Sequence, residues 1–319
     1  MENLFPRVGY YSRVSNTIYR SPHHITGFWV PVRSGDPLTT GSLGAGVLVE
    51  PGIYGRGLKI DCRVMVDGGC VEIKPARIIE EEAMLGNGIE VRSSIPLGMG
   101  GAVSAFIALA LSCEAIKNRL GSCSVKENLL EASRLAHKAE VLSLTGLGDV
   151  IAMVTGGGLV MRLKPGAPGY GEAIAIRDPE LDRVFFTIAS IERRITTPDM
   201  LSTMWDRIAS AGMEAYREFQ KDPGLEMFLE ISNGFSRRVG FLSGDFGNAI
   251  DRSLDPLVRR GEVLGYYAKK SLLVIAHRKG AELEIPRSIG SLVKKVLGIY
   301  KPAVKGFEAV GDMDTSGSS

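Results

Sequence analysis

Long hydrophobic runs are absent from this 319-residue sequence. No segment continues for the ~18 residues that a membrane-spanning helix needs without meeting a charge or a helix breaker. The opening stretch MENLFPRVGYYSRVSN also has no continuous apolar core of the kind that a signal peptide contains. We therefore expect a soluble, cytoplasmic protein that does not bind a membrane.

A dominant charge is lacking as well. The 38 Lys and Arg residues are matched by 36 Asp and Glu, which gives a net charge of +2. There is no long basic block of the kind that binds nucleic acid or anionic lipid. We expect no nucleic-acid partner, and small molecules are the expected ligands.

Cysteine is scarce, with only Cys62, Cys70, Cys113 and Cys123 in the chain. Their spacing matches no zinc or redox motif. Four cysteines in a chain of this length do not make a disulfide scaffold. We expect four ordinary thiols.

Glycine, by contrast, is abundant: 39 of 319 residues, about 12%, against roughly 7% in typical proteins. The glycines lie among apolar runs without a G-X-Y period, which excludes collagen and flexible linkers. With 45% hydrophobic residues, the chain can build one large or two ordinary domains. The glycine surplus therefore belongs to folded turns.

The first quarter of the chain has the β-branched, aromatic and turn residues of strands, followed by helical patterns. A nearly all-apolar stretch at 102–120 predicts a buried helix that stops at Gly121. Ser124 and Glu127 form a capping-box pattern before a second helix that runs through Glu140. Further strands are predicted at 23–32, 44–52, 58–68, 71–79, 90–96, 159–163, 173–178, 183–191 and 271–278, and further helices at 200–219 and 225–239. The stretch PGAPGYG at 165–171 is the best candidate for a linker, and the polar residues 311–319 for a frayed tail.

Three segments could carry chemistry. The first is IPLGMGGAVSAFIALA at 95–110, where glycines join a strand to a helix. Backbone N–H groups at such a turn and at the helix N-terminus suit phosphate, although neither the Walker motif nor G-x-G-x-x-G is present, since Val103 replaces the third glycine. A tight turn with small residues for close packing is the alternative.

The second segment is TGLGD at 145–149, where one acid stands between glycines and an apolar run. A carboxylate there can accept a proton from an alcohol if a cation keeps it ionised. The alternative is that Asp149 is a helix N-cap.

The third segment, SPHHITGFWVPVRSGDPLTTGSLGAG at 21–46, is rich in hydroxyls and predicts recognition of a small polar ligand. A decorated hairpin is the alternative. Because His23 and His24 are adjacent, only one can face a pocket from a strand, which argues against a two-histidine metal site.

In this order, the three segments resemble the GHMP-type small-molecule kinases, and the third closely resembles the opening motif of the archaeal pantoate kinases. PLGMGGAVS at 96–104 matches the phosphate loop of that family, and TGLGDV at 145–150 its acidic motif. The loop is a couple of residues shorter, with the serine shifted to Ser104 or replaced by Ala102. Leu43, Ser271 and Leu272 also differ from the family pattern.

The resemblance implies an α+β fold of two lobes with ATP and substrate in the cleft between them. The N-terminal lobe, 1–164, would be β-rich and similar to domain 2 of ribosomal protein S5. The C-terminal lobe, 165–310, would be ferredoxin-like, followed by the tail at 311–319. The implied reaction is transfer of the ATP γ-phosphoryl group to the primary hydroxyl of pantoate, giving 4-phosphopantoate for coenzyme A synthesis, and a homodimer is a family-level expectation. A GHMP kinase for another alcohol, such as homoserine or mevalonate, and a catalytically silent nucleotide-binding relative are the alternatives.

The resemblance also implies roles for individual residues. Asp149 would orient or deprotonate the substrate hydroxyl, and Glu140 with Ser104 would hold Mg²⁺. Arg33 or Arg92 would neutralise the substrate carboxylate. The nucleotide phosphates would lie against Pro96, Gly98, Gly100, Gly101, Ala102 and Ser104. The polar groups of the substrate would contact His24, Thr26, Thr40 and Ser42.

Overall fold

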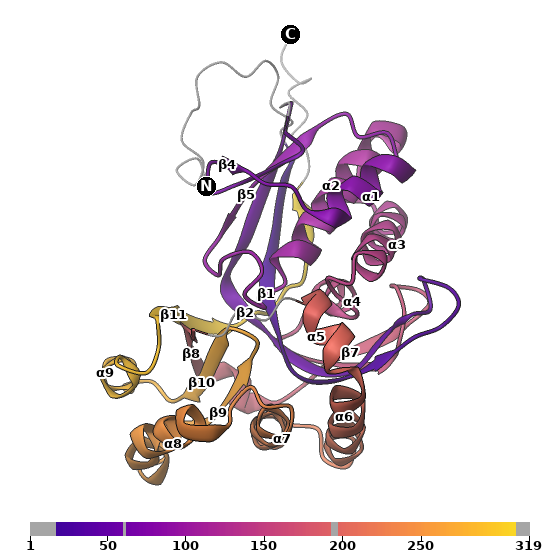
Figure 1. The fold of residues 1–319 in the computed structure, drawn as a ribbon. Helices are drawn as coiled ribbons and strands as arrows, with labels where there is room; N and C mark the ends of the chain where they lie inside the picture. The colour runs from indigo at the N-terminus through magenta and orange to yellow at the C-terminus, as the bar shows by residue number, and fades with distance from the viewer. Residues whose placement is uncertain (1–16, 60–61, 193–196, 311–319) are drawn as a thin grey trace.

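The computed structural model describes residues 17–59, 62–192 and 197–310. Their strands form one curled, mixed sheet, with the order β4-β3-β5-β2-β11-β8-β10-β9 along its main path. β1 pairs with β2 and β12, and β6 pairs with β2 and β7. Strands from both ends of the chain therefore meet in the same sheet (Figure 1). A mixed α+β fold is confirmed.

A long antiparallel hairpin of β1 (Ile18–Val32) and β2 (Gly41–Leu58) is the centre of the sheet. His24 lies opposite Leu48, and its neighbour His23 opposite Val49. β1 is buried along most of its length, as expected for a strand covered on both faces. The predicted strands at 23–32 and 44–52 are confirmed, and both are longer than predicted.

The strands predicted at 90–96, 159–163, 173–178, 183–191 and 271–278 are confirmed to within a few residues, and the strands at 69–70, 263–269, 295–302 and 308–310 were not predicted. Of the predicted strand at 58–68, the described residues after the end of β2 form only the short strand β3. The remaining strands are β3 (Val64–Val66), β4 (Gly69–Cys70), β5 (Gly88–Ser93), β6 (Leu159–Lys164), β7 (Glu172–Ile176), β8 (Phe185–Ser190), β9 (Val263–Lys269), β10 (Leu272–His277), β11 (Lys295–Pro302) and β12 (Glu308–Val310).

The predicted strand at 71–79 is wrong, because most of it forms the helix α1 (Lys74–Glu82). Pro75 sits in the first turn of α1, where its missing N–H costs no hydrogen bond. The stretch 165–171, predicted as a linker, connects β6 to β7, which pair antiparallel with each other.

The buried helix predicted at 102–120 is α2 (Val103–Leu120), and Gly121 ends it in the left-handed conformation, as predicted. The next helix is α3 (Lys126–Leu142), whose N-cap is Val125 without a side-chain hydrogen bond, so the predicted capping box is wrong. The Ser124 N–H instead donates to the Ser122 hydroxyl. Together, α1, α2 and α3 pack on one face of the long strands (Figure 1).

The C-terminal helices lie against the other end of the sheet, where α6 and α7 contact β1 and α8 contacts β9 (Figure 1). The predicted helix at 200–219 is divided at Met204, and the helix at 225–239 is confirmed. These elements are α5 (Thr197–Thr203), α6 (Trp205–Phe219), α7 (Leu225–Arg238), α8 (Gly244–Arg259), α9 (Glu284–Ile289) and the 3₁₀ turn η2 (Pro179–Asp182). None of the helices in the described ranges has both the length and the apolar character needed to span a bilayer. The tail predicted at 311–319 lies outside those ranges.

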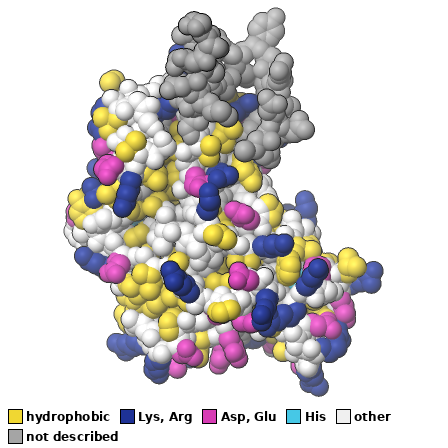
Figure 2. Space-filling model, turned by 180° about the vertical axis from the view of Figure 1, so that it is seen from behind, with side chains coloured by type: hydrophobic (Ala, Val, Ile, Leu, Met, Phe, Trp, Pro, Cys, Tyr) yellow, Lys and Arg dark blue, Asp and Glu magenta, His cyan; other side chains and the backbone are white. Residues whose placement is uncertain are grey.

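Two hydrophobic cores stabilise the fold. One, between the sheet and α6–α8, contains Phe28 and Phe228; the other, beneath α1–α3, contains Phe106 and Ile107. On the face shown in Figure 2, Lys and Arg side chains alternate with Asp and Glu, as the nearly balanced charge leads one to expect.

The expectation of four free thiols is wrong, because the structure pairs Cys62 with Cys70 and Cys113 with Cys123. The first pair brackets the turn through β3 and β4. The second joins α2 to the loop that follows it. Spacing alone could not show these bonds, since the folding back of the chain is what brings each Cα pair to 6.0 and 5.3 Å.

Reduction of the disulfides is expected to lower the free energy of unfolding. Loops of this length restrict the unfolded chain by about 2–3 kcal/mol for each bond. Thermal or denaturant unfolding with and without reductant measures the effect, and the variant with all four cysteines changed to serine is the control. Reductant should not change the stability of that variant, and an unchanged wild-type curve would show that the thiols are free.

Candidate active site

A cleft of about 570 Å³ opens where the two ends of the sheet meet. Its lining includes β1 and β2, the loop before α2, the turn between α3 and α4 (Asp149–Thr155), and the turn between β9 and β10. Residues at the start of α1, in α5 and in β6 complete it. All three segments that the sequence singled out contribute to this one cleft. Their side chains therefore belong to a single site.

The loop at 96–102, here called the phosphate loop, carries glycines in conformations that other residues rarely adopt. Gly98 has φ 87° and Gly100 has φ 112°. Ala102 is left-handed at the N-cap of α2, and no side chain caps that helix. The N-terminus of a long helix therefore presents its N–H groups and positive dipole to the cleft. Gly98, Gly100, Ala102 and Ser104 line the cleft, but Pro96 and Gly101 do not.

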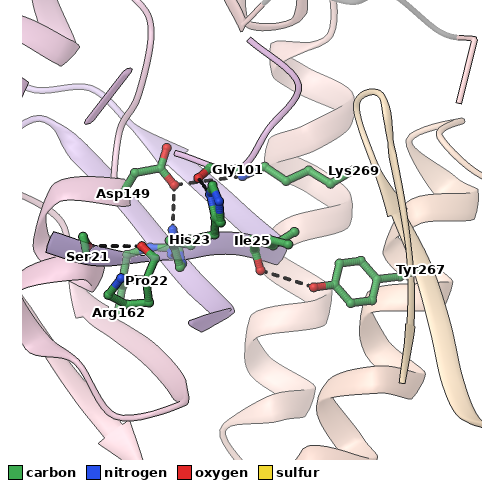
Figure 3. A network of polar contacts seen from close by, with 10 residues as sticks. Ser21, Pro22, His23, Ile25, Gly101, Asp149, Arg162, Tyr267 and Lys269 are labelled. Carbon is green, nitrogen blue, oxygen red and sulfur yellow. Dashed lines mark hydrogen bonds and ion pairs between the residues drawn. The ribbon is translucent and has the colours of Figure 1, made fainter. Parts of the chain in front are cut away.

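His23 anchors the phosphate loop from below. Burial lowers the pKa of His23 to about 4, so the ring is neutral. Its Nδ1–H donates to the carbonyl of Gly101 at 2.8 Å, because that oxygen can only accept (Figure 3). Nε2 lies 3.0 Å from the Ser94 hydroxyl, which also donates to the carbonyl of Pro51. The sequence had not assigned a role to His23.

Asp149 is the first residue of α4, and Gly148 is the N-cap, so the alternative reading of Asp149 as a cap is wrong. Its carboxylate accepts a hydrogen bond from His24 Nδ1 at 2.6 Å. His24 Nε2 accepts from the Arg162 guanidinium at 3.3 Å. Burial lowers the pKa of His24 to about 4, so the ring is neutral, and these two hydrogen bonds place its proton on Nδ1. Both ring nitrogens are thus engaged beneath Asp149, and His24 does not line the cleft.

Asp149 is held in its ionised form. Burial by itself raises its pKa, but Lys269, 4.0 Å away, together with the His24 hydrogen bond and Arg162, lowers it well below the ordinary value. A carboxylate with a cation beside it is the arrangement that keeps a base unprotonated at neutral pH.

The pKa of Glu140 is shifted in the opposite direction from that of Asp149. Burial raises its pKa to about 7, although the hydroxyls of Ser104 and Thr145 donate to Oε1 at 2.5 and 2.8 Å. The other oxygen, Oε2, is buried and has no hydrogen-bond partner. A Cβ at Gly146 would lie 2.5 Å from Oε2, so only glycine allows this approach. The carboxylate and the Ser104 hydroxyl both line the cleft.

The residues predicted to bind substrate separate into two groups. Thr26 and Ser42 line the cleft. Thr40 does not: its hydroxyl accepts from Ser34 N–H at 3.0 Å, and its carbonyl accepts from His137 Nε2 at 2.8 Å.

The arginines predicted for the substrate carboxylate also lie elsewhere. Arg33 stacks on Trp205, 4.1 Å from the ring centre. Arg92 lies beside Glu90 on β5, at 3.7 Å. Neither lines the cleft. This placement corrects the expectation for both.

Sequence reasoning missed four cations that do line the cleft: Lys74, Arg162, Lys269 and Lys270. Arg162 is 1% exposed, and burial lowers its pKa to about 10, so it stays charged. A charged residue inside the apolar strand LVMRL was the one signal for Arg162. Lys269 is the last residue of β9, and Lys270 follows it directly.

The fold and the site define a GHMP-type small-molecule kinase. A phosphotransferase related to the CoA biosynthesis pathway superimposes with a TM-score of 0.73 at 26% identity, covering 92% of this chain and 98% of that one. The mevalonate-3-kinase of Thermoplasma acidophilum, bound to mevalonate 3-phosphate and ADP, shares the fold at 12% identity with a TM-score of 0.58, covering 94% and 99%.

The chain belongs to the pantoate kinase family. It is 31% identical to the pantoate kinase of Thermococcus kodakarensis over 258 residues, which cover 75% of this chain and 80% of the relative. No family model matches the sequence.

Proposed function

We propose that the protein is an ATP-dependent kinase that phosphorylates the primary hydroxyl of pantoate to 4-phosphopantoate, a step of archaeal coenzyme A synthesis. The observation that carries the proposal is Asp149, a partly buried carboxylate kept ionised beside a glycine loop at a helix N-terminus. Membership of the pantoate kinase family supports the choice of substrate. The kinase relatives support ATP as the phosphoryl donor.

The phosphate loop is assigned to the nucleotide. Gly98, Gly100, Ala102 and Ser104 face the cleft at the N-terminus of α2, where phosphate oxygens find N–H donors and a positive dipole. Pro96 and Gly101 contribute by shaping the loop, since Met99 N–H bonds to the Pro96 carbonyl and His23 to that of Gly101.

Glu140 and Ser104 are assigned to Mg²⁺. The residues fit such an ion, because Oε2 of Glu140 is a buried oxygen without a partner, and Mg²⁺ in kinases is held by one or two protein oxygens together with the phosphates. When bound, the ion neutralises charge on the phosphate oxygens. Binding would also deprotonate Glu140, whose pKa of about 7 leaves part of it neutral at physiological pH.

Thr26 and Ser42 are assigned to the polar groups of pantoate, and Arg162 replaces Arg33 and Arg92 as the partner of its carboxylate. The Nε of Arg162 is buried without a hydrogen-bond partner, and a Cβ at Gly148 would lie within 2.6 Å of both Arg162 Nε and Ser42 Oγ. The guanidinium and hydroxyl thus converge beneath the same glycine. Thr40 does not line the cleft, and we assign it a structural role, because its hydrogen bonds to Ser34 and His137 hold the loop between β1 and β2.

In the reaction, Asp149 orients the pantoate hydroxyl and accepts its proton. The hydroxyl oxygen forms a bond to the γ-phosphorus while the bond to the ADP oxygen breaks. His24 holds the Asp149 carboxylate in place, and its neutral ring does not compete for the proton. Such a transfer depends mainly on position and charge.

We also propose the division into an N-terminal lobe, 1–164, similar to domain 2 of ribosomal protein S5, and a ferredoxin-like C-terminal lobe, 165–310. The core beneath α1–α3 is built mostly from the first of these segments, which supports it, whereas the other core draws residues from both. A homodimer and a cytoplasmic location remain predictions.

The test is a substrate panel scored by ADP release. Purified protein with ATP and Mg²⁺ should release ADP with pantoate, and the specificity constant for pantoate should exceed those for homoserine and mevalonate by at least about 100-fold. All three alcohols carry a carboxylate, so the discrimination depends on whether the rest of the molecule lets that carboxylate and the reacting hydroxyl reach the buried polar groups of the site together. A higher specificity constant for another alcohol would show that this alcohol, and not pantoate, is the substrate. Nucleotide binding without turnover on any of them would indicate a silent relative.

A further inference from the structure

The phosphate loop contains no basic residue, although a transferring phosphoryl group needs positive charge around it. In the described part of the chain, the basic side chains that line the cleft are Lys74, Arg162, Lys269 and Lys270. Lys74 is exposed on α1, at the edge of the cleft. Arg162 lies beneath His24, on the substrate side. The turn between β9 and β10 is therefore the place from which cations can reach the phosphates.

Lys269 spans the distance between the phosphate loop and Asp149. Its Cδ is 3.8 Å from the point where a Cβ of Gly100 would be, and its carbonyl oxygen is 3.6 Å from that point. Its ammonium group is 4.0 Å from Asp149 Oδ1 (Figure 3). The aliphatic stem of Lys269 thus packs along the phosphate loop, and its ammonium group lies beside Asp149, the residue proposed to receive the substrate proton.

Lys270 occupies the left-handed turn position, with φ 56°, and is 5% exposed. Its electrostatic partners are Lys269, Asp149 and Glu140. The conformation turns two consecutive lysines toward one cleft, whereas in a regular strand they would face opposite sides of the sheet.

Basic side chains outnumber acidic ones among the described residues that line the cleft. Lys269, Lys270 and Arg162 are all buried there, and the acidic side chains among the described lining residues are Asp149 and Glu140. A cleft lined in this way favours an anionic ligand, because the ligand adds negative charge beside cations that have left water.

We propose that Lys269 and Lys270 bind the γ-phosphoryl group of the nucleotide, with Lys269 bridging it to Asp149 during transfer. This inference rests on the proposed kinase function and adds catalytic residues to it. Neither lysine changes its covalent state: the γ-phosphoryl group moves from ATP to the acceptor oxygen and ADP leaves, the proton moves to Asp149, and the ammonium groups neutralise the charge of the oxygens. A cationic turn from the far end of the chain thus complements a phosphate loop without a lysine.

The test separates binding of the third phosphate from binding of the rest of the nucleotide. Lys269→Met and Lys270→Met keep the aliphatic stem and remove the charge. By calorimetry, each should weaken a non-hydrolysable ATP analogue about 10–100-fold, as expected for a lost charged hydrogen bond, and change the affinity for ADP less than about threefold. Lys279→Met, at an exposed site after β10, is the matched control and should change neither.

Kinetics distinguishes a catalytic lysine from a structural one. Lys269→Met should lower kcat about 100-fold or more, and it should move the acidic limb of the pH profile upward, because Asp149 then keeps His24 and Arg162 but loses its nearest ammonium group. Lys269→Arg should restore part of kcat. Equal losses of ADP and analogue affinity, or a kcat near that of wild type, would overturn the proposal. Both measurements use wild type as reference, so absence of wild-type turnover on pantoate would count against the proposed function and not against the nucleotide contact.

Discussion

Asp149→Asn is expected to reduce kcat for pantoate phosphorylation about 1000-fold, within the range for loss of a positioned general base. The amide has the shape of the carboxylate and can still accept from His24, but it cannot take the proton of the substrate hydroxyl. Because the carboxylate is ionised throughout the neutral range, the loss should be the same from pH 6 to pH 9. Steady-state ADP release across that range measures it.

The same experiment includes a control for correct folding of the variant. Asp149→Asn removes the counter-charge of Lys269 and Arg162, so some loss of stability is expected, and binding of an ATP analogue is measured to show that the cleft remains formed. Asp222→Asn, at an exposed site, should behave as wild type. Turnover that survives in Asp149→Asn would show that the hydroxyl loses its proton elsewhere.

Glu140→Gln is expected to lower kcat about 100-fold and to raise the Mg²⁺ concentration needed for half-maximal rate at least tenfold. The amide keeps the hydrogen-bond acceptor used by Ser104 and Thr145 but replaces the unpartnered carboxylate oxygen. A metal titration of the rate at fixed ATP measures the change. An unaltered Mg²⁺ dependence would remove Glu140 from the metal site.

The same substitution should stabilise the ligand-free protein above pH 7. Burial raises the pKa of Glu140 from 4.5 to about 7, so ionisation of this group opposes folding. The penalty is absent below about pH 4.5, grows as the pH rises toward 7, and is then constant at about 3 kcal/mol. Urea unfolding of wild type and Glu140→Gln at pH 5 and pH 8 should show the larger gain at pH 8, and Glu230→Gln, on the exposed side of α7, should show none.

These opposite effects on activity and stability follow from one property of the site. Glu140 is buried with an oxygen that makes no hydrogen bond, which costs stability in the ligand-free protein. A bound cation would recover that cost, and binding and folding would then be linked. Replacing a glutamate with a purely structural role would not lower activity and raise the stability of the ligand-free protein at the same time.

The expectations that failed did so where local patterns compete. The run VEIKPARII contains β-branched residues, but packing of α1 against α2 and α3 selected a helix, with Pro75 in its first turn. Ser124 and Glu127 have the spacing of a capping box, yet the helix begins at a position where that serine is not the cap. The disulfides depend on chain reversals that spacing does not encode.

Local sequence by itself determined the parts of the site that are made by consecutive residues. The glycines of the phosphate loop, the helix behind it and Asp149 between glycines are short-range features, because backbone conformation and helix dipoles are set within one or two turns. Only the tertiary structure decided which charges surround them. Arg162 comes from β6 and Lys269 from β9, more than a hundred residues apart, and both act on Asp149 because the sheet brings these strands to one cleft. The ionisation of a buried carboxylate depends on charges within a few ångströms in space, whatever their separation along the chain.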